Sequence, residues 1–170
     1  MSTPYEIRAI APDVLARLRE RDDAGDPPRL VLDESGGSPL RWCLNRSEPG
    51  EVLALVSYAP LRRWARETDA DPGPYSEVGP VFIHTEDCGG WPGGEAGGGY
   101  PDALRGGRRV LRAYSARGGI LGGLLIDGGS PTVEEGLARL YADPQVAAVH
   151  VRAVEFGCFH AETRRTAEAG

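Results

Sequence analysis

The sequence predicts an α+β fold: a mainly antiparallel β-sheet of about six to seven strands with two helices packed on one face. Segments with alternating or continuously apolar residues follow one another through tight turns, which is typical of antiparallel strands. Two further segments repeat apolar residues at helical spacing. A chain of 170 residues, 41% of them hydrophobic, is large enough to bury one core, so we expect a single domain over residues 1–170.

The strands are expected from their apolar patterns. In the segment 40–45, apolar Trp42 and Leu44 alternate with polar neighbours, as in a half-buried strand, and Pro49 and Gly50 supply the turn that follows it. We predict strands over residues 5–10, 40–45, 51–61 and 80–86, a hairpin over 108–127 that turns at 117–119, and a final hairpin that includes residues 149–164.

The two helices are expected over residues 11–23 and 130–143. In the second, Ser130 is the expected N-cap, Pro131 takes the first helical position, and Glu134 and Glu135 suit the positive end of the helix dipole. Residues 62–79 are rich in charge, glycine and proline and predict a loop. Residues 87–101 are so rich in glycine that we expect a flexible loop there.

The final hairpin carries several reactive side chains. A three-residue loop at 155–157 has glycine at its last position, as such loops prefer. In this register Arg152 lies opposite His160 and His150 lies opposite Glu162, where a carboxylate can orient an imidazole. The face formed in this way contains His150, Arg152, Cys158, His160 and Glu162. The alternative is the solvated outer face of an antiparallel sheet, which is also polar.

The composition excludes several functions. All 19 basic residues are arginine, so a lysine Schiff base, a pyridoxal phosphate anchor and a phosphate-loop lysine are excluded. The net charge of −6 argues against nucleic acid as a partner, because its binders need clustered positive charge. No segment approaches the ~18 apolar residues of a membrane span, and residues 1–12 do not have the pattern of a signal peptide. We therefore expect a cytoplasmic protein with reduced cysteines and no membrane partner.

Histidine and cysteine residues allow two other interpretations. One is a metal site, for which the pairs His84 and Cys88, and Cys158 and His160, supply the ligand types. Four positions along a strand span ~13 Å, so the chain would have to turn after Glu86 for His84 and Cys88 to share an ion. Alternatively, Cys88 or Cys158 could be a nucleophile activated by a histidine, although small buried cysteines are common in protein cores. Cys43 has no evident partner in the sequence.

The stretch "PYSEVGPVFIH" is a further candidate. Its prolines and glycine stiffen the chain and could direct Tyr75 and Glu77 toward the strand that carries His84. The alternative is a rigid connection with exposed polar side chains.

Four stretches together resemble, in order, the motifs of the bacterial domain-of-unknown-function family 1203: "RWCLNRSEPGEVLALVSYAP", "PYSEVGPVFIHTEDC", "RRVLRAYSARGGI" and "VHVRAVEFGCF". The resemblance covers about residues 40–165 and implies a small single-domain bacterial protein, with no settled activity to transfer. It includes the candidate positions Cys43, Tyr75, Glu77, Gly79, Pro80, His84, Cys88, His150, Arg152, Gly157 and Cys158. The family often has an asparagine shortly before the Gly–Cys pair, where this chain has residues 153–155, "AVE".

These observations favour a small cofactor-free enzyme of the isomerase, lyase or hydrolase type, acting on a small anionic metabolite, in specialised metabolism for instance. The expected catalytic residues are His150, Glu77, Cys158 and His84, and the expected substrate-binding residues are Arg152, Tyr75 and Cys88. No metal ligand belongs to this set, no cofactor is expected, the partner is a small-molecule ligand, and homo-oligomer formation is left open. A non-catalytic module that binds a small molecule or a protein, and a metal-dependent protein with histidine and cysteine ligands, are the two alternatives.

Overall fold

The computed structural model describes residues 3–94 and 99–167. The chain forms two compact units, each assembled from segments that lie far apart in the sequence. Unit 1 contains the chain up to Arg8, Pro60–Glu77, and the chain from Gly106 onward, and unit 2 contains Ala9–Ala59 and Val78–Arg105.

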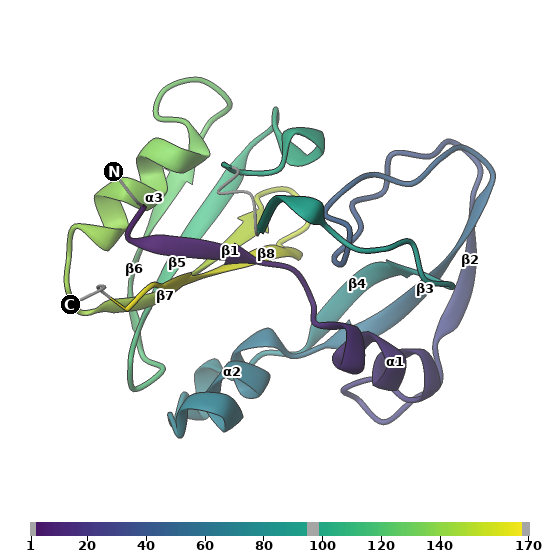
Figure 1. Cartoon of the computed structure of the whole chain (residues 1–170), viewed down its shortest axis with the longest axis horizontal. Coiled ribbons are helices and arrows are strands. Elements are labelled where there is room, and N and C mark those ends of the chain that lie inside the picture. Colours follow the sequence, from purple (N-terminus) through teal and green to yellow (C-terminus); the bar gives the residue numbers. More distant parts are fainter. Residues whose placement is uncertain (1–2, 95–98, 168–170) are drawn as a thin grey trace. The chain divides into compact units, whose positions relative to one another are not determined.

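Unit 1 is built on a five-stranded antiparallel sheet, sheet A, with the strand order β1-β8-β7-β5-β6 (Figure 1). The first strand therefore pairs with the last. The strands are β1 (Tyr5–Arg8), β5 (Arg109–Ser115), β6 (Ile120–Ile126), β7 (Val146–Ala153) and β8 (Phe159–Arg165).

Helices lie on both faces of sheet A. The α3 helix (Val133–Tyr141) packs Leu137 and Tyr141 against one face, where the Tyr141 ring stacks on that of Tyr5. The α2 helix (Pro60–Thr68) packs Leu61 and Trp64 against Tyr114 and Ala148 on the opposite face. Sheet A is thus covered on two sides, so both of its faces contain buried side chains.

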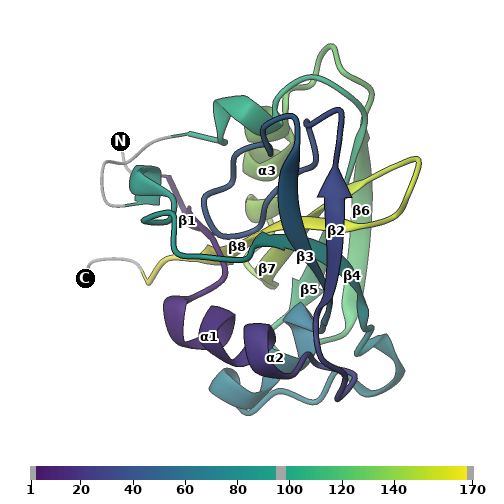
Figure 2. The same cartoon turned by 90° about the vertical axis from the view of Figure 1, so that its right-hand side faces the viewer.

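Unit 2 contains a three-stranded antiparallel sheet, sheet B, in which β3 lies between β2 and β4 (Figure 1), and Figure 2 shows this sheet with β2 nearest the viewer. The α1 helix packs against β3 and buries Leu15 and Leu18. The elements are α1 (Pro12–Glu20), β2 (Arg29–Asp33), β3 (Glu51–Tyr58) and β4 (Gly79–His84).

The predicted α+β class with antiparallel pairing is confirmed, but its details differ. The described part of the chain has eight strands in two sheets and three helices, and the helices of unit 1 lie on opposite faces of sheet A. Most of α2 fell in a segment predicted as loop. Its apolar residues Leu61, Trp64 and Ala65 have helical spacing, but arginines around them masked the pattern.

The predicted strand over residues 40–45 is wrong. Apart from a single bridge between Leu40 and Phe82, this segment is a loop in which Leu44 has a positive φ of 51°. The alternation of polar and apolar residues there comes from a folded-back loop that buries Leu40 and Leu44, so a period of two was not enough to identify a strand.

The start of α3 also differs from the prediction. Thr132, two residues after the expected Ser130, is the N-cap, and its hydroxyl accepts a hydrogen bond from the Glu135 backbone N–H. The Glu135 side chain accepts the Thr132 N–H in return, which completes a capping box. The hairpin between β5 and β6 was predicted correctly, since its turn lies at 116–119. The predicted flexible loop at 87–101 includes residues 95–98, which lie outside the described residues.

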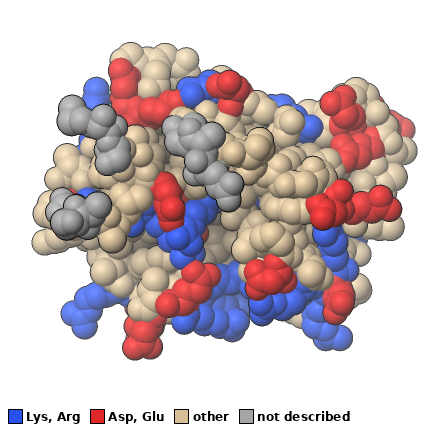
Figure 3. All heavy atoms as spheres, in the orientation of Figure 1, with Lys and Arg blue, Asp and Glu red and all other residues tan. Residues whose placement is uncertain are grey.

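Among the described residues, none of the helices is long and apolar enough to cross a membrane. In the face that Figure 3 shows, acidic side chains accompany the arginines in both units.

Candidate functional site

In unit 2, a folded-back loop over residues 36–47 positions Cys43. Its two arms are joined by backbone hydrogen bonds, for example from Leu40 N–H to the Asn45 carbonyl at 2.9 Å. The loop then docks on β4, where Leu40 forms a parallel bridge with Phe82 and the Arg41 N–H donates to the Phe82 carbonyl. Since Phe82 precedes His84 by two residues, this docking brings the tip of the loop to the end of β4.

Directly after His84 the chain turns. Such a turn is required if His84 and Cys88 are to bind the same metal ion. Arg19 of α1 holds this turn, because its guanidinium donates to the His84 carbonyl at 3.2 Å and to the Glu86 carbonyl at 2.8 Å. The Asp87 side chain accepts the Gly89 N–H at 2.7 Å, and Gly89 has a left-handed φ of 86°. The ~13 Å that an extended strand would impose is thereby removed.

The result is a cluster of Cys43, His84 and Cys88, whose two Sγ atoms and one imidazole nitrogen all lie within 4.8 Å of one another. His84 Nε2 lies 3.5 Å from Cys43 Sγ, and His84 Nδ1 forms a hydrogen bond with the Glu51 carboxylate. Glu51 and His84 come from adjacent strands, since His84 pairs with Leu53. A carboxylate behind one ring nitrogen fixes the tautomer and leaves the other nitrogen as a lone-pair donor.

The donor set of this cluster fits a transition metal ion. A tetrahedral ion with metal–sulfur and metal–nitrogen bonds of about 2.3 and 2.1 Å holds its sulfur and nitrogen ligands about 3.6 Å apart, close to the 3.5 Å between Cys43 and His84. Burial, with a smaller effect of the neighbouring Cys88, raises the pKa of the Cys43 thiol to about 11. Without an ion, Cys43 is therefore a neutral thiol near pH 7.

In unit 1, the final hairpin differs from its predicted register. His150 lies opposite Glu162 as predicted, but Arg152 lies opposite Phe159 and not His160. The register shifts between Val151 and Arg152, because β8 contains one extra residue there, a β-bulge. The connection consequently spans residues 154–158 instead of the predicted 155–157, although Gly157 has the expected positive φ of 69°.

His150 is buried within unit 1, with only 1% of its side chain exposed. Its ring lies between those of Tyr114 and Phe159, with centroids 4.8 and 5.2 Å away, and its Nε2 lies 3.4 Å from Glu162 Oε1. His150 and Glu162 are both buried. At these two residues the face of the sheet is therefore not the solvated surface of the alternative interpretation.

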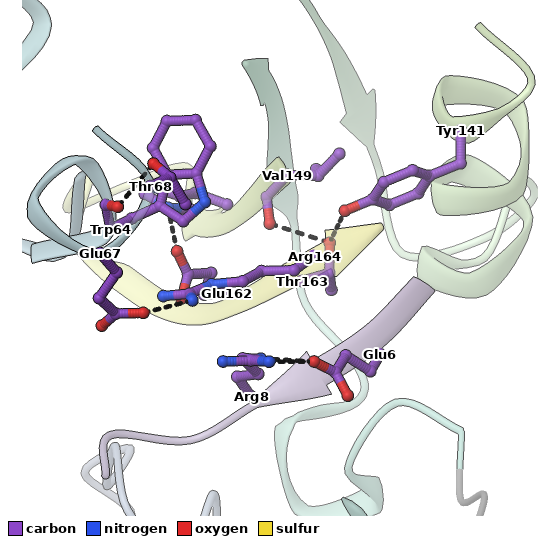
Figure 4. Close-up of polar contacts among 11 residues, drawn as sticks. Glu6, Arg8, Trp64, Glu67, Thr68, Tyr141, Val149, Glu162, Thr163 and Arg164 are labelled. Atoms are coloured by element: carbon purple, nitrogen blue, oxygen red, sulfur yellow. Dashed lines mark hydrogen bonds and ion pairs between the residues drawn. The ribbon is translucent and has the colours of Figure 1, made fainter. Parts of the chain in front are cut away.

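Glu162 belongs to a network of ion pairs that also includes Arg164 and Glu67, and Figure 4 shows these three residues. Its second oxygen lies 3.0 Å from Arg164 Nη2, and Arg164 Nη1 donates to Glu67 of α2 at 2.6 Å. Burial by itself would raise the pKa of Glu162, but the hydrogen bonds and charges of His150 and Arg164 outweigh it and hold that pKa below its usual value.

Glu77 meets two arginines on the same face of sheet A. Its Oε1 accepts a hydrogen bond from Arg112 Nη1 at 3.0 Å, and its Oε2 lies 3.2 Å from Arg152 Nη2. Arg112 also interacts with the hydroxyl of Tyr114. Burial raises the pKa of Tyr114 above its usual value, although Arg112 and Arg152 oppose this. Tyr114 is therefore a neutral phenol beside the two guanidinium groups.

The predicted site residues divide between the units. His150, Glu77, Arg152, Tyr75 and Cys158 belong to unit 1. There, Glu77 contacts Arg152, whereas Tyr75 is 47% exposed and Cys158 Sγ lies 3.7 Å from the Phe156 carbonyl oxygen. His84 and Cys88 belong to unit 2 and meet each other.

Sequence reasoning missed four contributors: Cys43 as a partner of His84, Glu51, Arg112 and Arg164. For Arg112 a signal was available. Side chains alternate between the two faces of a strand, so Arg112 lies on the opposite face of β5 from its apolar neighbours Leu111 and Ala113. For Cys43 and Glu51 the sequence holds no local signal, since loop docking and strand register create the contacts.

One of three comparisons with known proteins, the family comparison, agrees with the motif resemblance. Neither the curated proteins nor the solved structures gave a significant match. The family described as protein of unknown function (DUF1203) matches residues 37–165, a span that includes Cys43, His84, Cys88, Glu77 and Arg152. By this match over most of its length, the chain belongs to the DUF1203 family.

Proposed function

We propose that this protein binds a zinc ion through Cys43, His84 and Cys88. The single observation that carries the proposal is the convergence of two thiols and one imidazole within 4.8 Å, from the loop over residues 36–47 and from the end of β4 with the turn that follows it. The metal-dependent alternative considered from the sequence is therefore the function we favour.

The chemistry of the three donors selects the metal class. Two thiolates and an imidazole suit zinc, whereas the hard ions magnesium and calcium prefer oxygen ligands. Glu51 supports this assignment, because metal-binding histidines nearly always donate their second ring N–H to a carboxylate, a backbone carbonyl or water.

Two cysteines and one histidine are also a ligand set of catalytic zinc centres, in which water or substrate takes the fourth position. Cys88 is exposed and the His84 side chain is 21% exposed, so solvent can reach the cluster. A zinc ion held there would leave its fourth position to water and would supply Lewis-acid activation of that water for attack on a substrate. His84, Cys43 and Cys88 would hold the ion, and Glu51 would hold His84.

Metal content of the purified protein tests the proposal. We expect close to one zinc ion per chain by elemental analysis, and Cys43→Ser, His84→Gln and Cys88→Ser should each lose most of it. Glu51→Gln should keep the ligands but lower zinc affinity about 10- to 100-fold, the usual effect of removing such a partner.

Cys158→Ser is the matched control, because it removes a cysteine of unit 1 and should retain the zinc of the wild type. A wild-type zinc content under a tenth of an ion per chain, after growth with added zinc, would refute the proposal. A Cys43–Cys88 disulfide in freshly purified protein would point instead to a redox pair.

The cofactor-free acid/base enzyme stays a prediction that ranks below metal binding. It relied on His150 for proton transfer, and that ring is enclosed by Tyr114, Phe159 and Glu162. A cytoplasmic location is a further proposal, supported by the three free thiols, two of which must stay reduced to bind zinc.

A further inference from the structure

The two arginines beside Glu77 form a second candidate site, which involves none of the proposed zinc ligands. Arg112 on β5 and Arg152 on β7 share one face of sheet A, because Arg112 pairs with His150 and Arg152 follows His150 by two residues. Both guanidinium groups reach the same carboxylate, and each takes one of its two oxygens.

Their positions are fixed by contacts other than Glu77. Arg152 Nε donates to the Gly157 carbonyl at 3.0 Å, and Arg112 interacts with the buried Tyr114 hydroxyl. With 27% and 17% of their side chains exposed, Arg112 and Arg152 are far more enclosed than Glu77, at 49%. The arginines are thus held in place, whereas Glu77 reaches them from solvent.

The positive charge of Arg112 and Arg152 is only partly balanced by Glu77. Two positive groups face one carboxylate, and Tyr114 beside them is neutral. An ion pair with a half-exposed partner contributes little, because water solvates the free carboxylate well. A ligand with an oxyanion group can therefore compete with Glu77 for both arginines.

We propose that Arg112 and Arg152 form a binding site for the phosphate or carboxylate group of a small molecule, and that Glu77 occupies this site until the ligand displaces it. The backbone around Glu77 can stay in place during the exchange. Its segment is anchored to the β5–β6 turn by a hydrogen bond from Asp71 N–H to the Arg117 carbonyl, and Gly118 packs closely on Pro72. Only the Glu77 side chain has to rotate away.

Titration calorimetry with inorganic phosphate, and separately with acetate, tests the site. Glu77→Gln should bind phosphate about three- to tenfold more tightly than wild type, because the internal competitor loses its charge. Arg112→Gln and Arg152→Gln should each weaken binding about tenfold or more, since a charged hydrogen bond is lost. Glu77→Asp, with a shorter reach, should fall between wild type and Glu77→Gln.

Arg108→Gln is the matched control. Arg108 is an exposed arginine of unit 1 that pairs with Asp127 and Glu155, and its loss should leave phosphate affinity unchanged. Cys88→Ser separates this site from the proposed zinc centre, and should also bind phosphate as wild type does. Binding that survives Arg112→Gln but is lost in Cys88→Ser would place the phosphate on the metal and overturn the proposal.

Two other results would overturn it as well. The first is a Glu77→Gln variant, folded by circular dichroism, that binds phosphate no more tightly than wild type. The second is that neither phosphate nor acetate shifts the arginine Nε–Hε signals of wild type or Glu77→Gln in NMR spectra. A shift of the Arg152 signal with either probe supports the site, and the tighter probe identifies the ligand group.

Discussion

Glu162 illustrates how strongly a single residue depends on its partners. The carboxylate is buried, yet it is ionised because His150 and Arg164 face its two oxygens. An unpaired buried charge would be far less favourable than the same group in water. The residues of this network come from β7, β8 and α2, so its formation requires the tertiary structure of unit 1.

The lowered pKa of Glu162 predicts a pH dependence. The folded state binds the Glu162 proton less tightly than the unfolded chain, so this residue stabilises the fold above its unfolded pKa of about 4.5, and the contribution is lost as pH falls toward the lower folded pKa. Glu162→Gln should lower the free energy of unfolding by about 2 kcal/mol or more at pH 7. The difference in unfolding free energy between the variant and wild type should become smaller below about pH 4.5. Urea unfolding at a series of pH values measures it. A gap that is constant from pH 7 to pH 3 would contradict the prediction.

For single residues, the sequence indicated which side chains are reactive more readily than it indicated which residues they contact. His84, Cys88, Glu77 and Arg152 were singled out from the sequence by residue type, but their contacts Cys43, Glu51 and Arg112 lie on other segments. A cross-strand pair such as His150 and Glu162 could be predicted, because a short hairpin connects them. The bulge in β8 then defeated the same reasoning two residues further along, where Phe159 replaced His160 opposite Arg152.

Among the elements, α3 shows how packing can outweigh helix propensity. Gly136 lies in the middle of the helix and faces sheet A, where a Cβ atom would lie 2.7 Å from Leu111 Cδ1 and 2.8 Å from Ile126 Cδ1. Both of those side chains are buried and have little room to move. The glycine therefore permits the helix to approach the sheet.

We expect Gly136→Ala to lower stability, because overpacking costs about 1–3 kcal/mol while the gain in helix propensity is only about 1 kcal/mol. Ala138→Gly is the control at an exposed position of the same helix, where propensity alone should cost about 1 kcal/mol. Thermal or urea unfolding measures both variants. Stabilisation of Gly136→Ala by about 1 kcal/mol would show that the helix is not closely packed there.

The elements also show where sequence patterns succeed. The helix α1, strands β3, β4 and the β5–β6 hairpin could be predicted, since each has a clear period and a terminating turn. The α2 helix was hidden by its charges, and the loop over 40–45 imitated a strand. In both cases the buried residues were apolar as expected, but the partner surface that decides between helix, strand and loop is not encoded locally.

For the whole molecule, the division into two compact units predicts which strands metal binding should stabilise. All three proposed zinc ligands and Glu51 belong to unit 2. A ligand stabilises the structure that binds it by mass action, and local opening is suppressed where the ligand is held.

Hydrogen exchange should therefore respond unevenly to zinc. Removal of the ion by a chelator should speed exchange in β3, in β4 and in the loop over residues 36–47, while the strands of sheet A keep their protection. Mass spectrometry of peptides from each unit measures this, with Cys88→Ser as the metal-free reference. Equal acceleration in both sheets would show that the units open together.

The division of the chain between units has a consequence for the order of events during translation. Every residue of unit 2 precedes Gly106, whereas β1 of unit 1 is synthesised early and finds its pairing strand only when Phe159–Arg165 has emerged. Domains tend to fold as their residues leave the ribosome. A nascent chain can thus bring Cys43, His84 and Cys88 together, and would bind the proposed zinc ion, before β8 has been made and sheet A is complete.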